Sequence, residues 1–142
     1  MARLSRIRGT TAYLDTNLFI YAVEGYEPEE AFVRALFLAL EGGEFAAVTS
    51  ELTLAEVLVR PFALGREDVA ATYIELLRPS ERLAVVPVDR AVLVEAARQR
   101  AALGIRLPDA IHVATALASG CGAFLTNDRR LKLPPGVRQV LL

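Results

Sequence analysis

The sequence predicts an α/β protein: a single α/β/α domain whose central sheet has four or five parallel strands and is covered by helices on both faces. Three observations favour this class. Short apolar segments alternate along the chain with longer segments of helical periodicity, the pattern of parallel strands joined by helices. The apolar segments are apolar at nearly every position, which is typical of strands buried on both faces. A chain of 142 residues fits one domain, so we expect residues 1–142 to form it.

In the first half of the chain, turn and capping residues set the expected limits of each element. Pro28 suits a first helical turn because it has no N–H to satisfy, and Gly42 is a typical helix end. Ser50 can cap the next helix, and Pro61 is expected to end it. The expected elements are a strand over 11–15, a helix over 28–42, a strand over 45–50, a helix over 51–60 and a helix over 66–79.

The second half continues the same alternation. Asp68 and Asp89 each precede a helical pattern and are interpreted as helix caps, and Gly104 is expected to end the helix that Asp89 begins. The expected elements are a strand over 82–88, helices over 90–103 and 108–119, a strand over 122–127 and an edge strand over 137–142.

Composition and charge exclude several classes of protein. Cys121 is the single cysteine, which excludes an internal disulfide and favours a reducing compartment. The basic N-terminus reaches Asp15 without an apolar signal-peptide core, and His112 and small residues interrupt the longest uncharged run. We therefore expect a cytoplasmic protein with no membrane partner. The net charge of −1 argues against a generally basic nucleic-acid binder but permits local basic patches.

Three of the five aspartates lie in or beside apolar segments: Asp15, Asp109 and Asp128. A charge among apolar side chains costs several kcal/mol unless it is paired, hydrogen-bonded or bound to a metal. Asp15 ends the first expected strand and Asp128 follows the fourth. Because ligands of open parallel sheets bind outside the carboxyl ends of the strands, both aspartates are expected at that edge.

Two further carboxylates are expected near the same edge, and each candidate has a structural alternative. Glu56 interrupts a nearly continuous apolar helix, where it could instead pair with Arg60. Asp109 lies in the first turn of the helix over 108–119, where it could simply favour the positive helix end. Asp128 could be a turn residue. Asp15 has no cation nearby in sequence, so it is the hardest of the four to explain structurally.

Carboxylates that gather in one pocket repel each other unless a cation joins them. Oxygen ligands suit the hard cations Mg²⁺ and Mn²⁺, which bind through one or two carboxylates, several waters and substrate phosphates. Such a site hydrolyses phosphodiester bonds. Asn17 and Thr126 are expected beside the acids as neutral hydrogen-bond partners. One cysteine and one histidine cannot form a zinc cluster, and no phosphate-binding loop of the P-loop type is present.

Four segments in order, "LDTN", "SELTLAE", "LPDAIHVATAL" and "LTND", resemble the PIN-domain ribonucleases and, more narrowly, the VapC-type toxins of toxin–antitoxin pairs. The resemblance implies a Mg²⁺- or Mn²⁺-dependent endoribonuclease that acts on RNA, forms a homodimer and is inhibited by a cognate antitoxin protein. Matched residue by residue, it implies catalytic and metal-binding roles for Asp15, Glu56, Asp109 and Asp128, with Asn17, Ser50 and Thr126 as polar companions. Many members carry an acid and an aromatic residue where this chain has Arg130 and Leu131.

Other residues have two interpretations each. Arg129, Arg130 and Lys132 could neutralise RNA phosphates at the mouth of the site, or form a solvated turn. His112 lies one turn after Asp109 and could touch substrate, or be a hydrogen-bonded core or interface histidine. The apolar helix over 29–40 packs in the core and could also line an antitoxin or dimer groove.

Two other functions compete with a nuclease. A catalytically silent PIN-like module that binds RNA or protein is the main alternative, although it need not keep all four acids. A response-regulator domain shares the architecture, but Asp15 lacks the adjacent or i+2 aspartate that such domains use.

Overall fold

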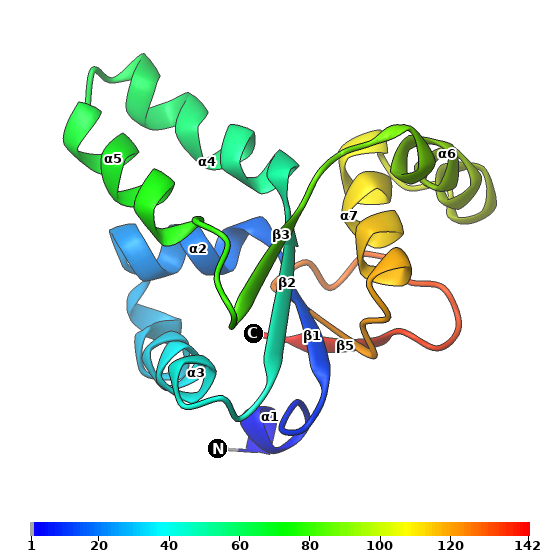
Figure 1. Cartoon of the computed structure of the whole chain (residues 1–142), viewed down its shortest axis with the longest axis horizontal. Coiled ribbons are helices and arrows are strands. Elements are labelled where there is room, and N and C mark those ends of the chain that lie inside the picture. The colour runs from blue at the N-terminus through cyan, green and yellow to red at the C-terminus, as the bar shows by residue number, and fades with distance from the viewer. Residues whose placement is uncertain (1) are drawn as a thin grey trace.

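The central sheet has five parallel strands in the order β3-β2-β1-β4-β5, with helices on both of its faces (Figure 1). The computed structural model describes residues 2–142. The predicted α/β architecture is confirmed, and the expected edge strand near the C-terminus is present as the fifth strand. The strands are β1 (Thr11–Leu14), β2 (Ala46–Ser50), β3 (Leu83–Val86), β4 (Ala123–Thr126) and β5 (Arg138–Leu141).

The strand order reverses at β1, which is the first strand in the chain and the middle strand of the sheet. Tyr13 of β1 lies opposite Val48 of β2 on one side and Phe124 of β4 on the other. The chain runs outward from β1 through β2 to β3, and then crosses to β4 and β5 on the other side. The carboxyl ends of β1 and β4 therefore form the switch point where open α/β sheets bind ligands.

The helices divide into two layers that pack on opposite faces of the sheet. Leu14 and Leu125 belong to the core under the first layer, while Tyr13 and Phe124 belong to the core under the second. Within residues 2–142, no helix is long and apolar enough to cross a membrane. The first layer consists mainly of α2 (Thr16–Glu24), α3 (Glu30–Glu41), α4 (Glu51–Ala63) and α5 (Glu67–Leu76), and the second of α6 (Arg90–Leu103) and α7 (Leu107–Ala118) (Figure 1).

Helix α2 is the main element that the sequence did not predict. It begins directly after Asp15, and Leu18 and Phe19 are fully buried against the sheet. The segment contains aromatic and β-branched residues of modest helix propensity, so packing rather than intrinsic preference stabilises the helix. Two other short elements were also not predicted: α1 (Ala2–Ser5) and the 3-10 turn η1 (Glu27–Glu29).

Two details of the predicted helix limits are wrong. Helix α4 continues past Pro61 to Ala63, because a proline so close to the helix end removes only one hydrogen bond and Leu64 N still donates to Arg60 O at 3.0 Å. Asp68 does not cap α5; it lies in the first turn and pairs with the exposed guanidinium of Arg66. The caps predicted for α4 and α6 are confirmed, since Ser50 accepts from Leu52 N and Asp89 accepts from Val92 N.

Candidate active site

Asp15 joins the ends of the two strands at the switch point. Its backbone N donates to Leu125 O of β4 at 3.0 Å, and its side chain caps α2 by accepting from Thr16 N at 2.8 Å. The other carboxylate oxygen, Oδ2, accepts from the Thr126 hydroxyl at 2.7 Å. The structure thus supplies partners for Asp15 from both β4 and α2, which explains how a half-buried charge is held there.

Asp128 is connected to Asp15 through the same hydroxyl. The backbone N of Asp128 donates to Thr126 Oγ1 at 3.0 Å, so the fully buried Thr126 side chain bridges the two aspartates. The Asp128 carboxylate also accepts from Arg130 N at 2.9 Å. The turn that was the structural alternative for Asp128 is therefore present, and it places the carboxylate at the sheet edge rather than excluding it from a site.

Glu56 reaches the site from α4, on the same helix that Ser50 begins. Its Oε1 accepts from the Thr16 hydroxyl at 2.8 Å and lies 2.6 Å from His112 Nε2. Because Thr16 also donates its backbone N–H to Asp15, this single residue links the two acids. The alternative pairing of Glu56 with Arg60 is wrong: the partner is His112, on a helix that begins more than fifty positions later.

His112 is a buried, hydrogen-bonded residue, as the structural interpretation of this histidine predicted. Its side chain is 3% exposed, and its Nδ1 lies 2.5 Å from the hydroxyl of Tyr13. Tyr13 is fully buried, and its ring stacks on Phe124 at a centroid distance of 4.8 Å. The four side chains Tyr13, His112, Glu56 and Thr16 therefore form one continuous network from the core to the sheet edge.

The surroundings of Glu56 and Tyr13 shift their acidities in opposite directions. Burial opposes ionisation of Glu56, but the hydrogen bond and the electrostatic attraction of His112, followed by the hydrogen bond from Thr16 and the positive charge of Arg106, outweigh it and lower the pKa of this carboxyl. Burial, and then the negative charge of Asp15, raise the pKa of the Tyr13 hydroxyl well above its ordinary value. Glu56 is therefore held ionised, and Tyr13 keeps its proton.

Asp109 lies in the first turn of α7 and pairs with a residue that the sequence analysis missed. Arg106 Nε lies 3.1 Å from Asp109 Oδ2. The pKa of the Arg106 guanidinium is raised by its bond to Asp109 and further by the negative charges of Asp128 and Glu56. The Arg106 guanidinium thus pairs with one candidate acid and is influenced by the charges of two others. The i, i+3 spacing of Arg106 and Asp109, which carry opposite charges, is the signal in the sequence that could have identified this pair.

A small polar hollow of about 200 Å³ opens beside this guanidinium. Two of the candidate acids line it together with three cationic side chains, so it offers both kinds of charge that a metal-bound phosphate needs. These five residues are Arg106, Asp109, Asp128, Arg130 and Lys132. Arg129 is exposed at the same turn.

The arrangement of the acids limits how a metal ion could be held. Among the side chains of residues 2–142, no three His, Cys, Asp or Glu groups lie close enough together to bind one ion. Mg²⁺, however, needs only one or two protein carboxylates, with water and phosphate completing its octahedron. The carboxylate oxygens of the candidate acids therefore fit a Mg²⁺ ion that is also bound by water and phosphate. They do not form a site in which every ligand comes from the protein.

Two of the expected polar companions do not touch an acid. Asn17 donates to Asn127 Oδ1 at 2.7 Å, and Asn127 in turn donates to the hydroxyl of Tyr21. Ser50 is fully buried and caps α4, so it supports the helix that carries Glu56 rather than the carboxylate itself. Thr126 is the companion that contacts an acid directly.

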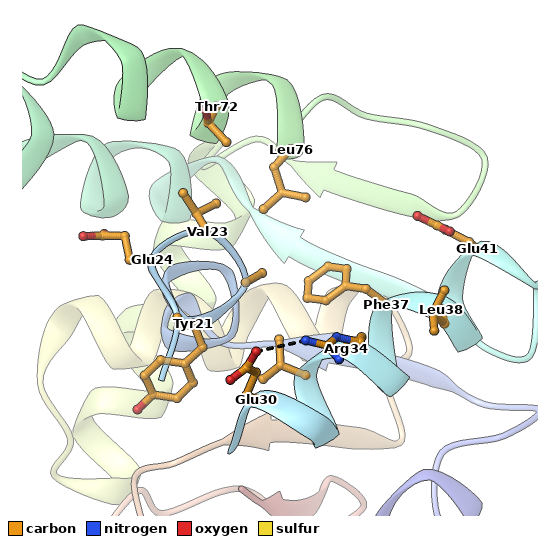
Figure 2. Close-up of a pocket in the computed structure, with 13 residues that line it drawn as sticks. Tyr21, Val23, Glu24, Glu30, Arg34, Phe37, Leu38, Glu41, Thr72 and Leu76 are labelled. Atoms are coloured by element: carbon orange, nitrogen blue, oxygen red, sulfur yellow. Dashed lines mark hydrogen bonds and ion pairs between the residues drawn. The ribbon is translucent and has the colours of Figure 1, made fainter. Parts of the chain in front are cut away.

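A larger groove of about 680 Å³ lies between α2, α3 and α5 (Figure 2). Its lining is mainly apolar, with Val23, Phe37 and Leu76 facing the hollow. Its rim carries three glutamates and one arginine: Glu24, Glu30, Glu41 and Arg34. Arg34 is paired with Glu30 at 2.9 Å, so the rim is acidic overall. Tyr21 lines the groove and also accepts from Asn127, which connects one end of the groove to the turn before Asp128.

Solved structures with a similar fold contain toxin–antitoxin proteins. A DNA-bound VapBC structure from Salmonella typhimurium matches with a TM-score of 0.68 and 23% identity, covering 92% of this chain and 96% of that one. VapBC2 from Rickettsia felis, bound to a promoter DNA fragment, matches with a TM-score of 0.66 and 18% identity, covering 91% and 96%. A toxin–antitoxin complex from Klebsiella pneumoniae matches with a TM-score of 0.64 and 24% identity, covering 89% and 94%.

Comparison with families of sequences gives the assignment. A search of the curated proteins finds no match to this chain. The family described as "PIN domain" matches residues 12–136, which include β2, β3, β4, all of β1 but its first residue, and all four candidate acids. The chain therefore belongs to the PIN domain family.

Proposed function

We propose that the protein is a Mg²⁺- or Mn²⁺-dependent endoribonuclease and the VapC-type toxin of a toxin–antitoxin pair. The observation that carries the proposal is the linkage of four carboxylates at the switch point of the sheet. Thr16 links Asp15 to Glu56, Thr126 links Asp15 to Asp128, and Arg106 pairs with Asp109 beside the hollow that Asp128 also lines. Membership of the PIN domain family, a family of nucleases, supports the same conclusion.

In this proposal Asp15, Glu56, Asp109 and Asp128 are the catalytic and metal-binding residues. The metal, when bound, supplies a positive charge that activates water and stabilises the phosphate. Hydrolysis adds the oxygen of water to phosphorus and breaks one P–O ester bond, and the remaining proton of the water ends on the leaving oxygen. Thr16, Thr126 and His112 hold the carboxylates in orientation, while Asn17 and Ser50 support the surrounding turn and helix.

The RNA substrate is proposed to enter over the turn that follows β4. Arg129, Arg130 and Lys132 are exposed there, and two of them line the hollow that contains Asp109 and Asp128. Cations that line the same hollow as the acids can hold the phosphates next to the scissile bond. The local basic turn provides this contact although the whole chain carries a net charge of −1.

The antitoxin is proposed to bind in the groove between α2, α3 and α5. One similar solved structure is described as a toxin–antitoxin complex and another as DNA-bound VapBC, which supports such a partner for this chain. An apolar hollow with an acidic rim fits an amphipathic segment that carries basic residues. Leu38 is 61% exposed at the groove, so Leu38→Asp should weaken the complex without loss of stability. A short reading frame for a DNA-binding protein immediately upstream would identify the partner.

We also propose a homodimer, as the resemblance to VapC-type toxins implies. The end of α4 exposes Val59, Phe62 and Leu64, each more than half exposed, and apolar side chains in such numbers favour an interface. Sedimentation equilibrium of the purified protein measures the mass directly.

One observation favours the silent PIN-like module as a second candidate. Each acid already has an internal partner, and no three acidic or histidine side chains of residues 2–142 form a metal cluster. A module of this kind would bind RNA without cutting it.

A cleavage assay separates the two candidates. The purified protein is incubated with single-stranded RNA in Mg²⁺, in Mn²⁺ and in EDTA, with DNA of the same sequence as a control and Asp109→Asn as the inactive variant. The endoribonuclease cuts RNA only with the metal present and only when Asp109 is intact. Cleavage in EDTA would overturn the metal mechanism, and binding without cleavage in either metal would establish the silent module.

A further inference from the structure

The strongest unexplained feature of the molecule is the buried line of hydrogen bonds that ends on one oxygen of Glu56. Tyr13 and His112 are 0% and 3% exposed, yet both are polar and both point along this line. Burying two polar side chains costs free energy unless they are paired, whereas apolar side chains of similar size would fill the same space without this cost. The pairing therefore serves the group at its end.

The donors and acceptors along the line follow from simple rules. An ionised carboxylate can only accept, so His112 Nε2 carries the proton that it shares with Glu56. The other ring nitrogen, Nδ1, lies 2.5 Å from the hydroxyl of Tyr13, which can either donate to the ring or accept from it. Tyr13 thus fixes the orientation of the His112 ring, in the same way that partners of metal-ligating histidines do.

The two oxygens of Glu56 are left in different situations. Oε1 takes both protein contacts, from His112 Nε2 at 2.6 Å and from the Thr16 hydroxyl at 2.8 Å. Within the part of the chain that the structure describes, residues 2–142, no protein group donates to Oε2. The carboxylate is therefore held by one oxygen and open at the other.

We propose that Tyr13 and His112 are positioning residues for Glu56: they tie Oε1 and leave Oε2 free to bind the cation or to accept a proton from the attacking water. The inference rests on the proposed function and deepens it. Neither residue is in a position to touch the substrate, because both side chains are buried. Their loss should therefore change turnover and metal affinity, and leave RNA binding unaltered.

Three variants separate positioning from packing. His112→Leu removes both ring nitrogens at similar volume, whereas His112→Gln keeps an N–H that can donate to Glu56. Tyr13→Phe removes the hydroxyl and keeps the ring that stacks on Phe124. Thr115→Val is the matched control, because Thr115 is fully buried on the same helix and its hydroxyl bonds only to the backbone O of Ile111. The readouts are kcat and KM on RNA, Mn²⁺ affinity by electron paramagnetic resonance, and the urea midpoint.

We expect His112→Leu to lose roughly 10- to 100-fold in kcat or Mn²⁺ affinity, the range found when residues that orient metal ligands are removed. KM for RNA should stay within about twofold, because the RNA contacts are elsewhere. His112→Gln should recover most of the loss, Tyr13→Phe should show a smaller loss of the same kind, and Thr115→Val should match the wild type.

Equal kcat and Mn²⁺ affinity in His112→Leu and wild type would overturn the inference, and so would a His112→Gln variant no better than His112→Leu. If His112→Leu fails to fold, the double variant Tyr13→Phe/His112→Leu removes both buried polar partners together and is tested in its place. If the wild type does not cleave RNA, the proposed function fails, and the Mn²⁺ affinities still decide the role of His112.

Discussion

The hydroxyl of Thr126 donates to Oδ2 of Asp15 at 2.7 Å, across 111 positions of the sequence. The same hydroxyl accepts from the backbone N of Asp128, so it uses both of its hydrogen-bonding roles to join two strand ends to one turn. The geometry at the centre of the candidate site thus depends on a single buried oxygen atom.

Removing that hydroxyl should therefore destabilise the fold as well as the site. We expect Thr126→Val to lower the free energy of unfolding by about 1–3 kcal/mol, because the partly buried N–H of Asp128 and a carboxylate oxygen of Asp15 lose their partner. Urea denaturation measures the change. Thr126→Ser keeps the hydroxyl and serves as the control; equal stability of the valine and serine variants would show that the bridge contributes nothing.

The lowered pKa of Glu56 predicts how stability changes with pH. A carboxyl whose pKa is lower in the folded than in the unfolded protein stabilises the fold above its unfolded value and loses that contribution as pH falls through the folded value. The contribution of Glu56 should therefore be complete at pH 7 and should decrease below about pH 4.5, the ordinary value for this group. In urea melts at pH 7, 5 and 4, the stability difference between wild type and Glu56→Gln should shrink with acidification. A difference that grows on acidification would contradict the hydrogen-bonded, ionised Glu56 described above.

Arg106 should compete with a metal ion for the acids that surround it. Replacing it by Gln removes one positive charge near Asp109, Asp128 and Glu56, so Mn²⁺ affinity should rise by roughly three- to tenfold at low salt, less when salt screens the charge. Arg98→Gln is the matched control, because Arg98 forms a similar exposed i, i+3 pair with Glu95 on α6. Titration calorimetry with Mn²⁺ gives both affinities. Weaker binding in Arg106→Gln would mean that the guanidinium helps to build the metal site.

The basic turn should set the salt dependence of RNA binding. Replacing Arg129, Arg130 and Lys132 by alanine should weaken binding and reduce the slope of log K against log salt by about one for each lost phosphate contact. Because Arg130 and Lys132 line the same hollow as Asp109 and Asp128, their loss should raise Mn²⁺ affinity, in the same direction as Arg106→Gln. Fluorescence anisotropy between low and moderate salt measures the slope. An unchanged slope would place the RNA elsewhere on the surface.

How much of this arrangement the sequence predicts depends on the kind of contact. Asp15 and Asp128 follow apolar strands, and the carboxyl ends of parallel strands meet at one edge, so their placement was predictable. The pairing of Glu56 with His112 was not, because it depends on how α4 and α7 are rotated about their own axes. Sequence spacing relates residues within one helix, which is why the local pair with Arg60 was the expected alternative and why it was wrong.

Helix α2 shows a second limit on what the sequence predicts. Its propensity is modest, and its start is fixed by Asp15, whose side chain caps the helix while also serving the sheet edge. From the sequence, Asp15 is interpreted only as a candidate metal ligand, so its second role as a helix cap is not predicted. Packing of Leu18 and Phe19, which decides that the segment is helical, is a tertiary effect and leaves little local signal.

The strand order has a consequence for the protein during its own synthesis. β1 is made first, but its neighbour β4 and the turn that carries Asp128 are made more than a hundred residues later. Because a parallel strand pair cannot form until both strands have left the ribosome, the nascent chain contains Asp15 and Glu56 without the other two acids for most of its elongation. If the protein is the endoribonuclease proposed above, this topology keeps it inactive until the last quarter of the chain has emerged.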